Sequence, residues 1–300
     1  MTATTCANRR RPSPGDVADL VRLPAVLSVP GDVLAGASLA VDGPRLPART
    51  VALAGASCLL YLGGMALNDV ADVEEDLDER PHRPIPSGRI DLPTARRIGH
   101  GLMVGGVALA ALAGRRSLAV ALPLAGAVYA YDFGLKHTPA GPAAMAACRS
   151  LDVLLGGTVG DTRRAAPAAA ALGLHTYALT TVSRHETTGG RPEVVRAAAV
   201  GGLAAAALTG RTVTRRGRGR GRWLAAGPLL VHGVLQGRAA RHAIETPTPA
   251  AAQRLVGTSV LGFVPLQSAV SLARGRGVLG TGLLGLWATA HRLARRRAVT

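Results

Sequence analysis

Charged side chains are scarce in this chain. Asp, Glu, Lys and Arg make up 18% of its 300 residues, against about 25% in a typical soluble domain. Mean hydropathy is positive, at +0.24, and Ala, Leu, Val and Gly supply most of the apolar content. This composition argues against an ordinary soluble protein and favours one that places helices in a membrane.

Cysteine is also scarce. Cys6, Cys58 and Cys148 lie far apart, and their odd number and spacing argue against a disulfide framework or a cysteine metal site. Residues 1–18 contain three consecutive arginines but no continuous apolar core followed by a cleavage site. We therefore expect no signal peptide, and a first hydrophobic segment that stays as a membrane anchor.

Negative charge is scarce relative to positive charge. The net charge is +17, and all but one of the 35 Lys and Arg residues are arginine. Such a balance suits nucleic acid, an acidic membrane surface or anionic substrates. The arginines fall mainly in short stretches between apolar runs, which is typical of loops that meet lipid headgroups. A nucleic-acid binder would gather them in one stripe on a polar fold, so we expect no nucleic-acid partner.

Ten apolar segments approach the roughly 20 residues that a helix needs to cross a bilayer. Several are rich in Ala and Gly, which favours close packing between helices. Only "ARGRG" separates the last two, so one of them is a candidate re-entrant or interfacial helix. We predict an all-α polytopic bundle of nine to ten transmembrane helices. The candidate segments are 20–41, 49–69, 93–113, 117–135, 141–160, 165–183, 194–210, 222–238, 254–273 and 277–292.

The predicted organisation is a single transmembrane domain, residues 20–294, between an N-terminal tail, 1–19, and a basic C-terminal tail, 295–300. We expect a multi-pass protein of the cell membrane, in contact with membrane lipids. Lys and Arg are divided too evenly between alternate loops to fix the orientation firmly. We place the N-terminal tail and the loops of the candidate site on the cytoplasmic side. The sequence leaves the oligomeric state open.

Acidic side chains gather in "LNDVADVEEDLDERPHRPIPSGRI", residues 67–90. On a helix with about 100° between successive residues, Asn68, Asp69, Asp72 and Asp76 share one arc of about 100°. Clustered carboxylates repel one another, and ionisable groups are costly in a membrane. A divalent cation would neutralise them, and oxygen ligands without His or Cys select Mg²⁺ or Ca²⁺ over zinc. The arc therefore predicts a metal site.

Arginines follow the acidic arc directly. Arg80, Arg83 and Arg89 lie on a proline-rich segment that turns at Gly88. Guanidinium groups match phosphate oxygens, and proline limits the ways in which such a loop folds. Acids that hold a metal beside arginines that hold an anion predict a Mg²⁺–diphosphate site. The alternative is a solvent-exposed loop of mutually paired charges.

These residues resemble a known family. "NDVADVEED" has the pattern N-D-x-x-D-x-x-x-D, and "RPHRPIPSG" is similar to the segment that follows it in UbiA-type intramembrane prenyltransferases. The resemblance implies a prenyl diphosphate held by Mg²⁺ at the membrane surface, loss of pyrophosphate to give an allylic cation, and attack by a lipophilic acceptor, often an aromatic ring. It also implies a bundle of about nine helices. Its sharp motif covers residues 68–88 alone.

The resemblance also implies roles for single residues. Lys136 follows an aromatic-rich helix end, "YAYDFGLKHT", and would contact diphosphate together with Arg22, Arg80 and Arg83. Arg22 has lipid-headgroup contact as its alternative. Tyr129, Tyr131 and Phe133 could line a pocket for the cation or form an interfacial aromatic belt. The implied metal ligands are Asn68, Asp69, Asp72 and Asp76. The implied catalytic residues are Asp72, Asp76, Lys136 and Glu186.

The second aspartate-rich motif of that family is missing. The corresponding stretch is "HTYALTTVSRHETTGG", and no aspartate follows Asp161. Glu186 would supply one carboxylate, Arg184 a phosphate contact, and His175 or His185 a nitrogen ligand or proton acceptor. This departure resembles an EboC-like branch more than the quinone-making members. It puts a second Mg²⁺ in doubt, and with it the acceptor chemistry.

Two other functions stay open. Terpene cyclisation would use the same ionised diphosphate, but it needs an aromatic-lined cavity and the chain has only eight aromatic residues. A bundle that has lost catalysis and serves in lipid or isoprenoid binding or transport is the second alternative, because intramembrane charges often mark transport paths. The prenyl chain length and the acceptor are not fixed by the sequence.

Overall fold

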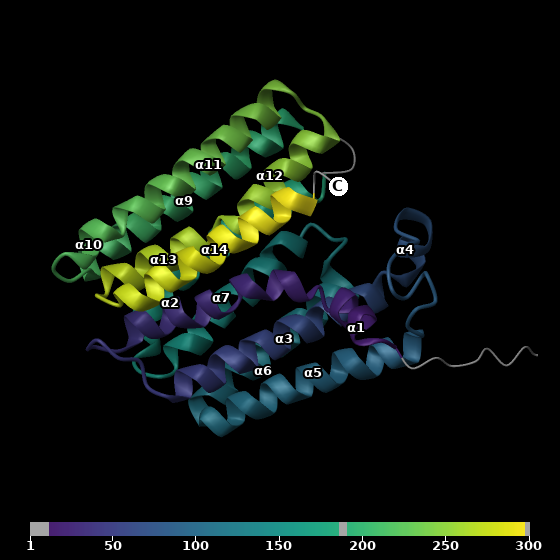
Figure 1. The fold of residues 1–300 in the computed structure, drawn as a ribbon, viewed down its shortest axis with the longest axis horizontal. Helices are drawn as coiled ribbons and strands as arrows, with labels where there is room; N and C mark the ends of the chain where they lie inside the picture. The colour runs from purple at the N-terminus through teal and green to yellow at the C-terminus, as the bar shows by residue number, and fades with distance from the viewer. Residues whose placement is uncertain (1–11, 186–190, 298–300) are drawn as a thin grey trace, which may run out of the picture.

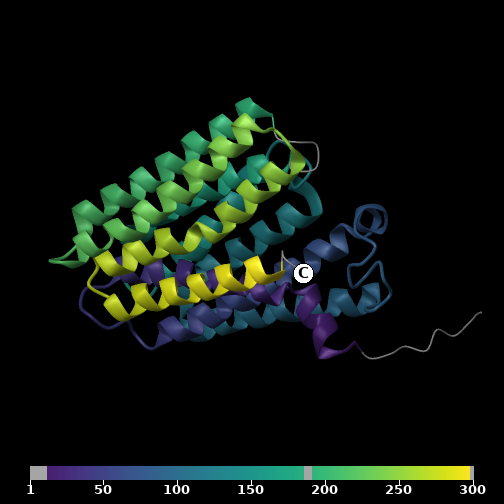
Figure 2. The same ribbon diagram turned by 45° about the horizontal axis from the view of Figure 1, so that its top comes forward.

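The computed structural model describes residues 12–185 and 191–297, and every regular element within them is helical. The long helices run roughly side by side, with the N-terminal helices on one side of the molecule and the C-terminal helices on the other (Figures 1 and 2). The N-terminal elements are α1 (Pro14–Leu20), η1 (Leu23–Ser28), α2 (Pro30–Ala40), α3 (Arg49–Ala71), α4 (Val73–Glu79), α5 (Leu92–Ala113), α6 (Arg115–Ala130), η2 (Tyr131–Leu135) and α7 (Gly141–Gly157). The C-terminal elements are η3 (Thr162–Ala165), α8 (Ala166–Ser183), α9 (Pro192–Arg216), α10 (Gly221–Leu224), α11 (Ala226–Glu245), α12 (Pro249–Leu261), α13 (Phe263–Ala273) and α14 (Gly277–Arg297).

The predicted apolar segments coincide with helices, but their lengths and continuity differ. Four continuous helical stretches in the described chain are long and apolar enough to cross a bilayer: Arg49–Ala71, Arg115–Leu135, Pro192–Arg216 and Pro249–Ala273. Helix α1 and the helical segment Ala25–Ala40 meet at an angle of 51°, and they make a fifth span if the pair is counted as one. The all-α bundle is confirmed. The count of nine to ten transmembrane helices stays a prediction.

Short polar signals set the helix ends. Proline stands in the first turn of α5, α7, α8 and α9, where its missing N–H would have no helical partner. The Asp91 carboxylate caps α5 by accepting from the Thr94 N–H at 2.7 Å. Gly114, at φ 134°, separates α5 from α6 in a conformation that favours glycine. These signals divide the apolar sequence into separate helices.

Helices α2 and α7 approach closely at the centre of the bundle. A Cβ atom at Gly36 would clash with the carbonyl oxygen of Val153, and one at Gly156 would clash with the carbonyl oxygen of Val33. Small residues at such contacts let two backbones meet. The approach joins the core of the N-terminal half to a second core around Phe263, on α13. It also places the polar residues of α2 and α7 next to one another.

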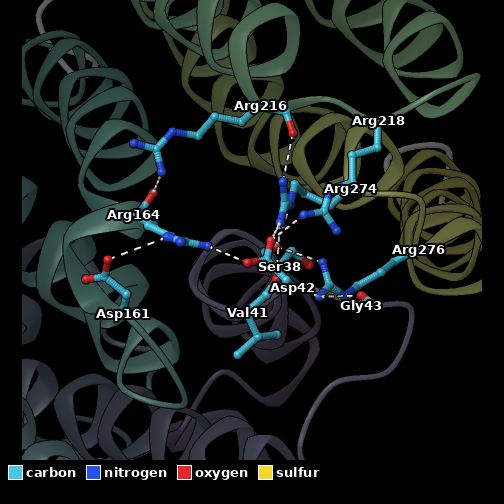
Figure 3. Close-up of polar contacts among 10 residues, drawn as sticks. All are labelled: Ser38, Val41, Asp42, Gly43, Asp161, Arg164, Arg216, Arg218, Arg274 and Arg276. Carbon is cyan, nitrogen blue, oxygen red and sulfur yellow. Dashed lines mark hydrogen bonds and ion pairs between the residues drawn. The ribbon is translucent and has the colours of Figure 1, made fainter.

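The end of the bundle opposite the acidic cluster is strongly basic (Figure 3). Asp42, just after α2, pairs with Arg164 at 2.7 Å, Arg218 at 2.5 Å and Arg274 at 2.8 Å. Arg276 donates to the carbonyl oxygens of Ser38, Val41 and Gly43. The Arg164 and Arg274 hydrogen bonds lower the pKa of the Asp42 carboxyl to about 2. Asp42 thus links the segment after α2 to three arginines of the C-terminal half.

Helix also lies between the predicted apolar segments. After segment 49–69, α4 continues the chain beyond the end of α3, over residues that the acidic arc treats as helical. Between segments 194–210 and 222–238, residues 211–216 are the last turns of α9, and α10 follows after four residues. The first described helix, α1, begins at Pro14, inside the segment predicted as an N-terminal tail. The Ser13 cap favours the start of α1, and helix-forming arginines allow α9 to continue, since charge alone does not end a helix.

Candidate active site

The four residues of the predicted metal arc are buried together at the end of α3. The exposed fractions are 8% for Asn68, 2% for Asp69, 4% for Asp72 and 0% for Asp76. The helix axis changes at Asp72, which ends α3 and begins α4. Neighbouring Glu74 is exposed. The four residues that the sequence places on one arc are therefore buried, whereas Glu74, outside the arc, is solvated.

Basic side chains hold the buried carboxylates in place. One nitrogen of Arg83 donates to Asp76 at 2.5 Å and to Asp69 at 3.2 Å. Arg80 also donates to Asp76, at 3.3 Å. Arg89, by contrast, pairs with Asp16 and Asp19 on α1. Two of the three arginines in the segment after the motif thus face the acidic cluster.

Arg22 reaches the same cluster from the first helical region. It donates to Asp69 at 2.8 Å. Its φ angle is 48°, and among the described residues it is the only non-glycine residue with a positive φ. That backbone region is unfavourable for a residue with a Cβ and concentrates at functional sites. The geometry supports a specific role for Arg22 rather than plain headgroup contact.

Lys136 reaches the cluster from the other side. It follows η2, a π-helical turn at the end of α6, and forms an ion pair with Asp72. Such turns occur often at functional sites. Its side chain is 20% exposed, so the ammonium group lies at the edge of the buried cluster. Two segments that are 64 residues apart therefore meet, as the sequence prediction requires.

Asp132 belongs to the cluster and was not predicted. It is 8% exposed, and its Oδ1 accepts from the Asn68 amide at 3.2 Å. Its other oxygen, Oδ2, is buried without a hydrogen-bond partner within the described structure. An acid within an apolar span was the available signal, because such residues are usually functional.

Carboxylate and amide oxygens are the ligands that suit a hard divalent cation. The carboxylate oxygens of Asp69, Asp72 and Asp76 do not form one group within 4.8 Å of one another in the described part of the chain. Within residues 12–185 and 191–297, Asp72, Glu75 and His137 bring ligand atoms within 4.8 Å of one another. Glu75 and His137 are largely solvated. Asp69 and Asp76 are not part of this group, and Arg83 binds both. Asp72 is thus the one residue shared by the predicted metal ligands and the group of ligand atoms that lie close together in the structure.

The region of the missing second motif is only partly described. Glu186 lies outside the described residues. Arg184 donates to the carbonyl oxygens of Thr138 and His137, at 2.6 and 3.3 Å, so it holds the loop that carries Lys136. His175 is buried in α8 and its Nε2 contacts the Ser259 carbonyl oxygen at 2.9 Å. That contact is in the C-terminal half of the bundle.

The aromatic side chains near Lys136 divide into two groups. Tyr129 stacks on His100 and on Phe133, and its hydroxyl lies 2.6 Å from His100 Nδ1. Phe133 is 53% exposed. Tyr131 is partly buried. The exposed rings of His100 and Phe133 agree with an interfacial belt, whereas Tyr129 and Tyr131 are both partly buried and Tyr129 packs against the core of the N-terminal half.

A second polar cluster lies deeper in the bundle. Asp32 on α2 is fully buried, pairs with Arg149 on α7 and accepts from Gln267 on α13 at 2.8 Å. Asp152 accepts from Ser57 at 2.7 Å. The guanidinium of Arg149 also lies 3.9 Å above the ring centre of Phe263. Sequence reasoning missed this cluster, although Arg149 and Asp152 are charges three residues apart in an apolar segment.

Solved structures with the same fold are known. One is the apo structure of a UbiA homolog from Aeropyrum pernix K1, with a TM-score of 0.66 and 18% identity over 82% of this chain and 96% of that one. Another is a UbiA homolog from Archaeoglobus fulgidus bound to GPP and Mg²⁺, with a TM-score of 0.62 and 12% identity over 85% of this chain and 99% of that one. At such identities the likeness shows the fold alone.

Sequence relatives match a shorter part of the chain. A digeranylgeranylglyceryl phosphate synthase from Methanopyrus kandleri is 37% identical over 111 residues, which are 37% of this chain and 38% of the relative. The synthase of the same name from Metallosphaera sedula is 43% identical over 100 residues, 33% of this chain and 35% of the relative. The match therefore spans less than two-fifths of either relative.

The family model covers much more of the chain. It describes the UbiA prenyltransferase family and matches residues 32–239. This segment contains the acidic cluster, Lys136 and the helices that position them. The chain belongs to the UbiA prenyltransferase family.

Proposed function

We propose that this protein is a membrane prenyltransferase that uses Mg²⁺ to ionise a prenyl diphosphate and transfers the prenyl group to a lipophilic acceptor. The observation that carries the proposal is the buried arrangement of Asp69, Asp72 and Asp76 among cationic side chains from three parts of the chain. Carboxylates suit the metal, and guanidinium and ammonium groups suit the diphosphate.

The aspartates of the motif and the basic side chains around them are paired with one another and are available for exchange. Three aspartates face Arg22, Arg80, Arg83 and Lys136. When a metal and a diphosphate enter together, the aspartates gain the metal and the basic side chains gain phosphate oxygens. The aspartates would then be neutralised by the metal and the basic side chains by the diphosphate, instead of by one another. Neither set of charges would be left buried and unpaired.

We assign Asn68, Asp69, Asp72 and Asp76 to the metal, with Asp132 holding the Asn68 amide in position. Bound Mg²⁺ supplies positive charge that stabilises the departing diphosphate. Arg22, Arg80, Arg83 and Lys136 would donate to the diphosphate oxygens, on which negative charge grows as the carbon–oxygen bond breaks. The electron pair leaves with diphosphate, the acceptor forms the new bond to carbon, and the acceptor loses a proton. Arg184 would hold the Lys136 loop.

Two observations bear on the fate of the allylic cation. In the stack of His100, Tyr129 and Phe133, the rings of His100 and Phe133 are exposed, so the stack does not enclose a cyclisation cavity. The named relatives are synthases of a glyceryl phosphate lipid. Both support transfer to a lipophilic acceptor over cyclisation. An aromatic acceptor remains part of the proposal without support from these relatives.

The experiment is a reaction with the purified full chain, Mg²⁺ and prenyl diphosphates of increasing length, each offered with a glyceryl phosphate lipid or an alkylated phenol. We expect pyrophosphate release and a product heavier than the acceptor by one prenyl group, detected by mass spectrometry. Pyrophosphate without a prenylated acceptor, together with a cyclic hydrocarbon, would contradict transfer. Absence of pyrophosphate with every substrate would contradict the whole proposal.

A further inference from the structure

A separate pocket lies in the C-terminal half of the bundle. It has a volume of about 340 Å³ and is bounded by α8, α9, α11 and α12. This volume is within the usual range for sites that bind small molecules. Apolar residues form most of its wall, and the polar floor contains His175 and His232. None of the residues assigned to diphosphate or metal lines it.

The outer wall of the pocket is built from glycines. Gly202 on α9 and Gly233 on α11 both line it, and a Cβ atom at either position would meet no atom within 4 Å. Their neighbours Leu203 and Val234 are 60% and 39% exposed. The wall therefore lies at the outside of the bundle, where α9 is long and apolar enough to face a bilayer. A lipophilic molecule would enter from that side.

The two histidines of the floor each carry one hydrogen-bond acceptor without a partner within the described structure. His175 Nε2 lies 2.9 Å from the carbonyl oxygen of Ser259, and His232 Nδ1 lies 3.0 Å from that of Gly262. A carbonyl oxygen only accepts, so the proton of each neutral ring must be on the nitrogen that faces it. The remaining nitrogens, His175 Nδ1 and His232 Nε2, carry lone pairs. Both are buried without a partner within the described structure.

The rest of the floor leaves these two nitrogens as the unmet acceptors. The side-chain oxygen of Gln236 accepts from Ser259, and its amide nitrogen donates to the carbonyl oxygen of Thr258. The two imidazole rings, 98% and 99% buried, are 5.1 Å apart and stay neutral in apolar surroundings. Buried acceptors without a donor are costly, so a donor is expected there.

We propose that this pocket binds a lipophilic molecule with a hydroxyl group, whose hydrogen is donated to His175 Nδ1 or His232 Nε2. The apolar body would lie against α8, α9 and α11, and the hydroxyl would reach the floor. This inference does not depend on the prenyl-transfer proposal, because it uses neither the acidic cluster nor the diphosphate site. The competing occupant is water that bridges the two rings.

A matched pair of ligands tests the hydroxyl directly. The full chain in lipid nanodiscs, without Mg²⁺ and without prenyl diphosphate, is titrated with 4-octylphenol and with its methyl ether, 4-octylanisole, by isothermal calorimetry. The ether has the same body but no hydrogen to donate. We expect saturable binding of the phenol at one site, with about tenfold weaker binding of the ether. Equal affinities would overturn the proposal, since the floor would then be satisfied by water.

A matched pair of variants tests the location. Gly233→Leu fills the pocket without changing either histidine, and we expect it to abolish binding of the phenol. Gly227→Leu is the control, because it lies on the same helix, outside the pocket, at a glycine with equally open surroundings. Binding that survives Gly233→Leu would overturn the location. Failure of pyrophosphate release would leave both comparisons intact, so the two proposals fail separately.

Discussion

Arg83 and Asp76 are joined by a contact of 2.5 Å, and the same guanidinium nitrogen also donates to Asp69. In the proposed mechanism this arginine would turn from the two metal ligands toward phosphate oxygens when metal and diphosphate bind. Its partner carboxylates are almost completely buried, whereas Arg83 itself is 17% exposed. The arginine is therefore the member of this group that is best placed to move toward a phosphate.

Replacement of Arg83 is expected to slow ionisation of the substrate. Arg83→Gln removes the charge that would face the departing diphosphate, and we expect pyrophosphate release to fall about 10²–10³-fold. The measurement is a steady-state assay with Mg²⁺ and a prenyl diphosphate. Arg89→Gln is the matched control, because Arg89 pairs with α1 instead of the acidic cluster. Equal rates for the two variants would contradict the assignment of Arg83.

The single lysine offers a test of geometry separate from charge. Lys136→Met is expected to lower the rate of pyrophosphate release about 10²-fold. Lys136→Arg keeps the charge but replaces a compact ammonium group with a planar, branched one. We expect an intermediate rate for this variant, because the larger group must fit beside buried Asp72. A rate equal to that of the parent would show that charge alone matters there.

The deeper cluster is expected to control stability. Arg149→Gln leaves Asp32 buried beside a neutral partner, which should cost about 3–5 kcal/mol of unfolding free energy. Asp32→Asn with Arg149→Gln removes both charges, and we expect most of that loss to be recovered. The measurement is a double-mutant cycle of unfolding in detergent. If the two losses simply add, the ion pair is not the reason for the burial of these residues.

The basic end of the bundle predicts a pH dependence. The Asp42 pKa is lowered to about 2 from 3.8 by Arg164 and then by Arg274. Because the folded pKa is the lower one, the stabilising effect of this carboxylate is fully present above pH 3.8 and is lost as the pH falls toward about 2. The difference in thermal midpoint between the parent and Asp42→Asn should be constant near neutral pH and shrink over that interval. A constant difference at all pH values would contradict the pairing shown in Figure 3.

The sequence predicted much of the fold and one side of the site. The apolar runs located the helices, and the period of the helix placed Asn68, Asp69, Asp72 and Asp76 on one buried face. It could not say which short helices join into one span, because apolar composition does not show whether the chain bends between them, as it does after α1.

Residues that meet across the bundle were harder to predict. Asp132 contacts Asn68, and Asp32 contacts Arg149, over sequence separations of 64 and 117 residues. Helical period says which face a residue occupies but not which helix lies opposite. The close contact of α2 with α7 at Gly36 brings Asp32 and Arg149 together, and that contact follows from packing of the whole bundle. Arg22 and Lys136 could be connected to the acids only through the family resemblance.

The most direct test of the central claim compares two acids in the same short segment. Asp72 is 4% exposed and lies in the cluster, whereas Glu74 is exposed beside it. The measurement is Mg²⁺-dependent pyrophosphate release by the parent, Asp72→Asn and Glu74→Gln, with and without EDTA. The account predicts release by the parent and Glu74→Gln, loss in Asp72→Asn at equal expression, and loss in all samples with EDTA. Release that persists in Asp72→Asn or in EDTA would contradict it.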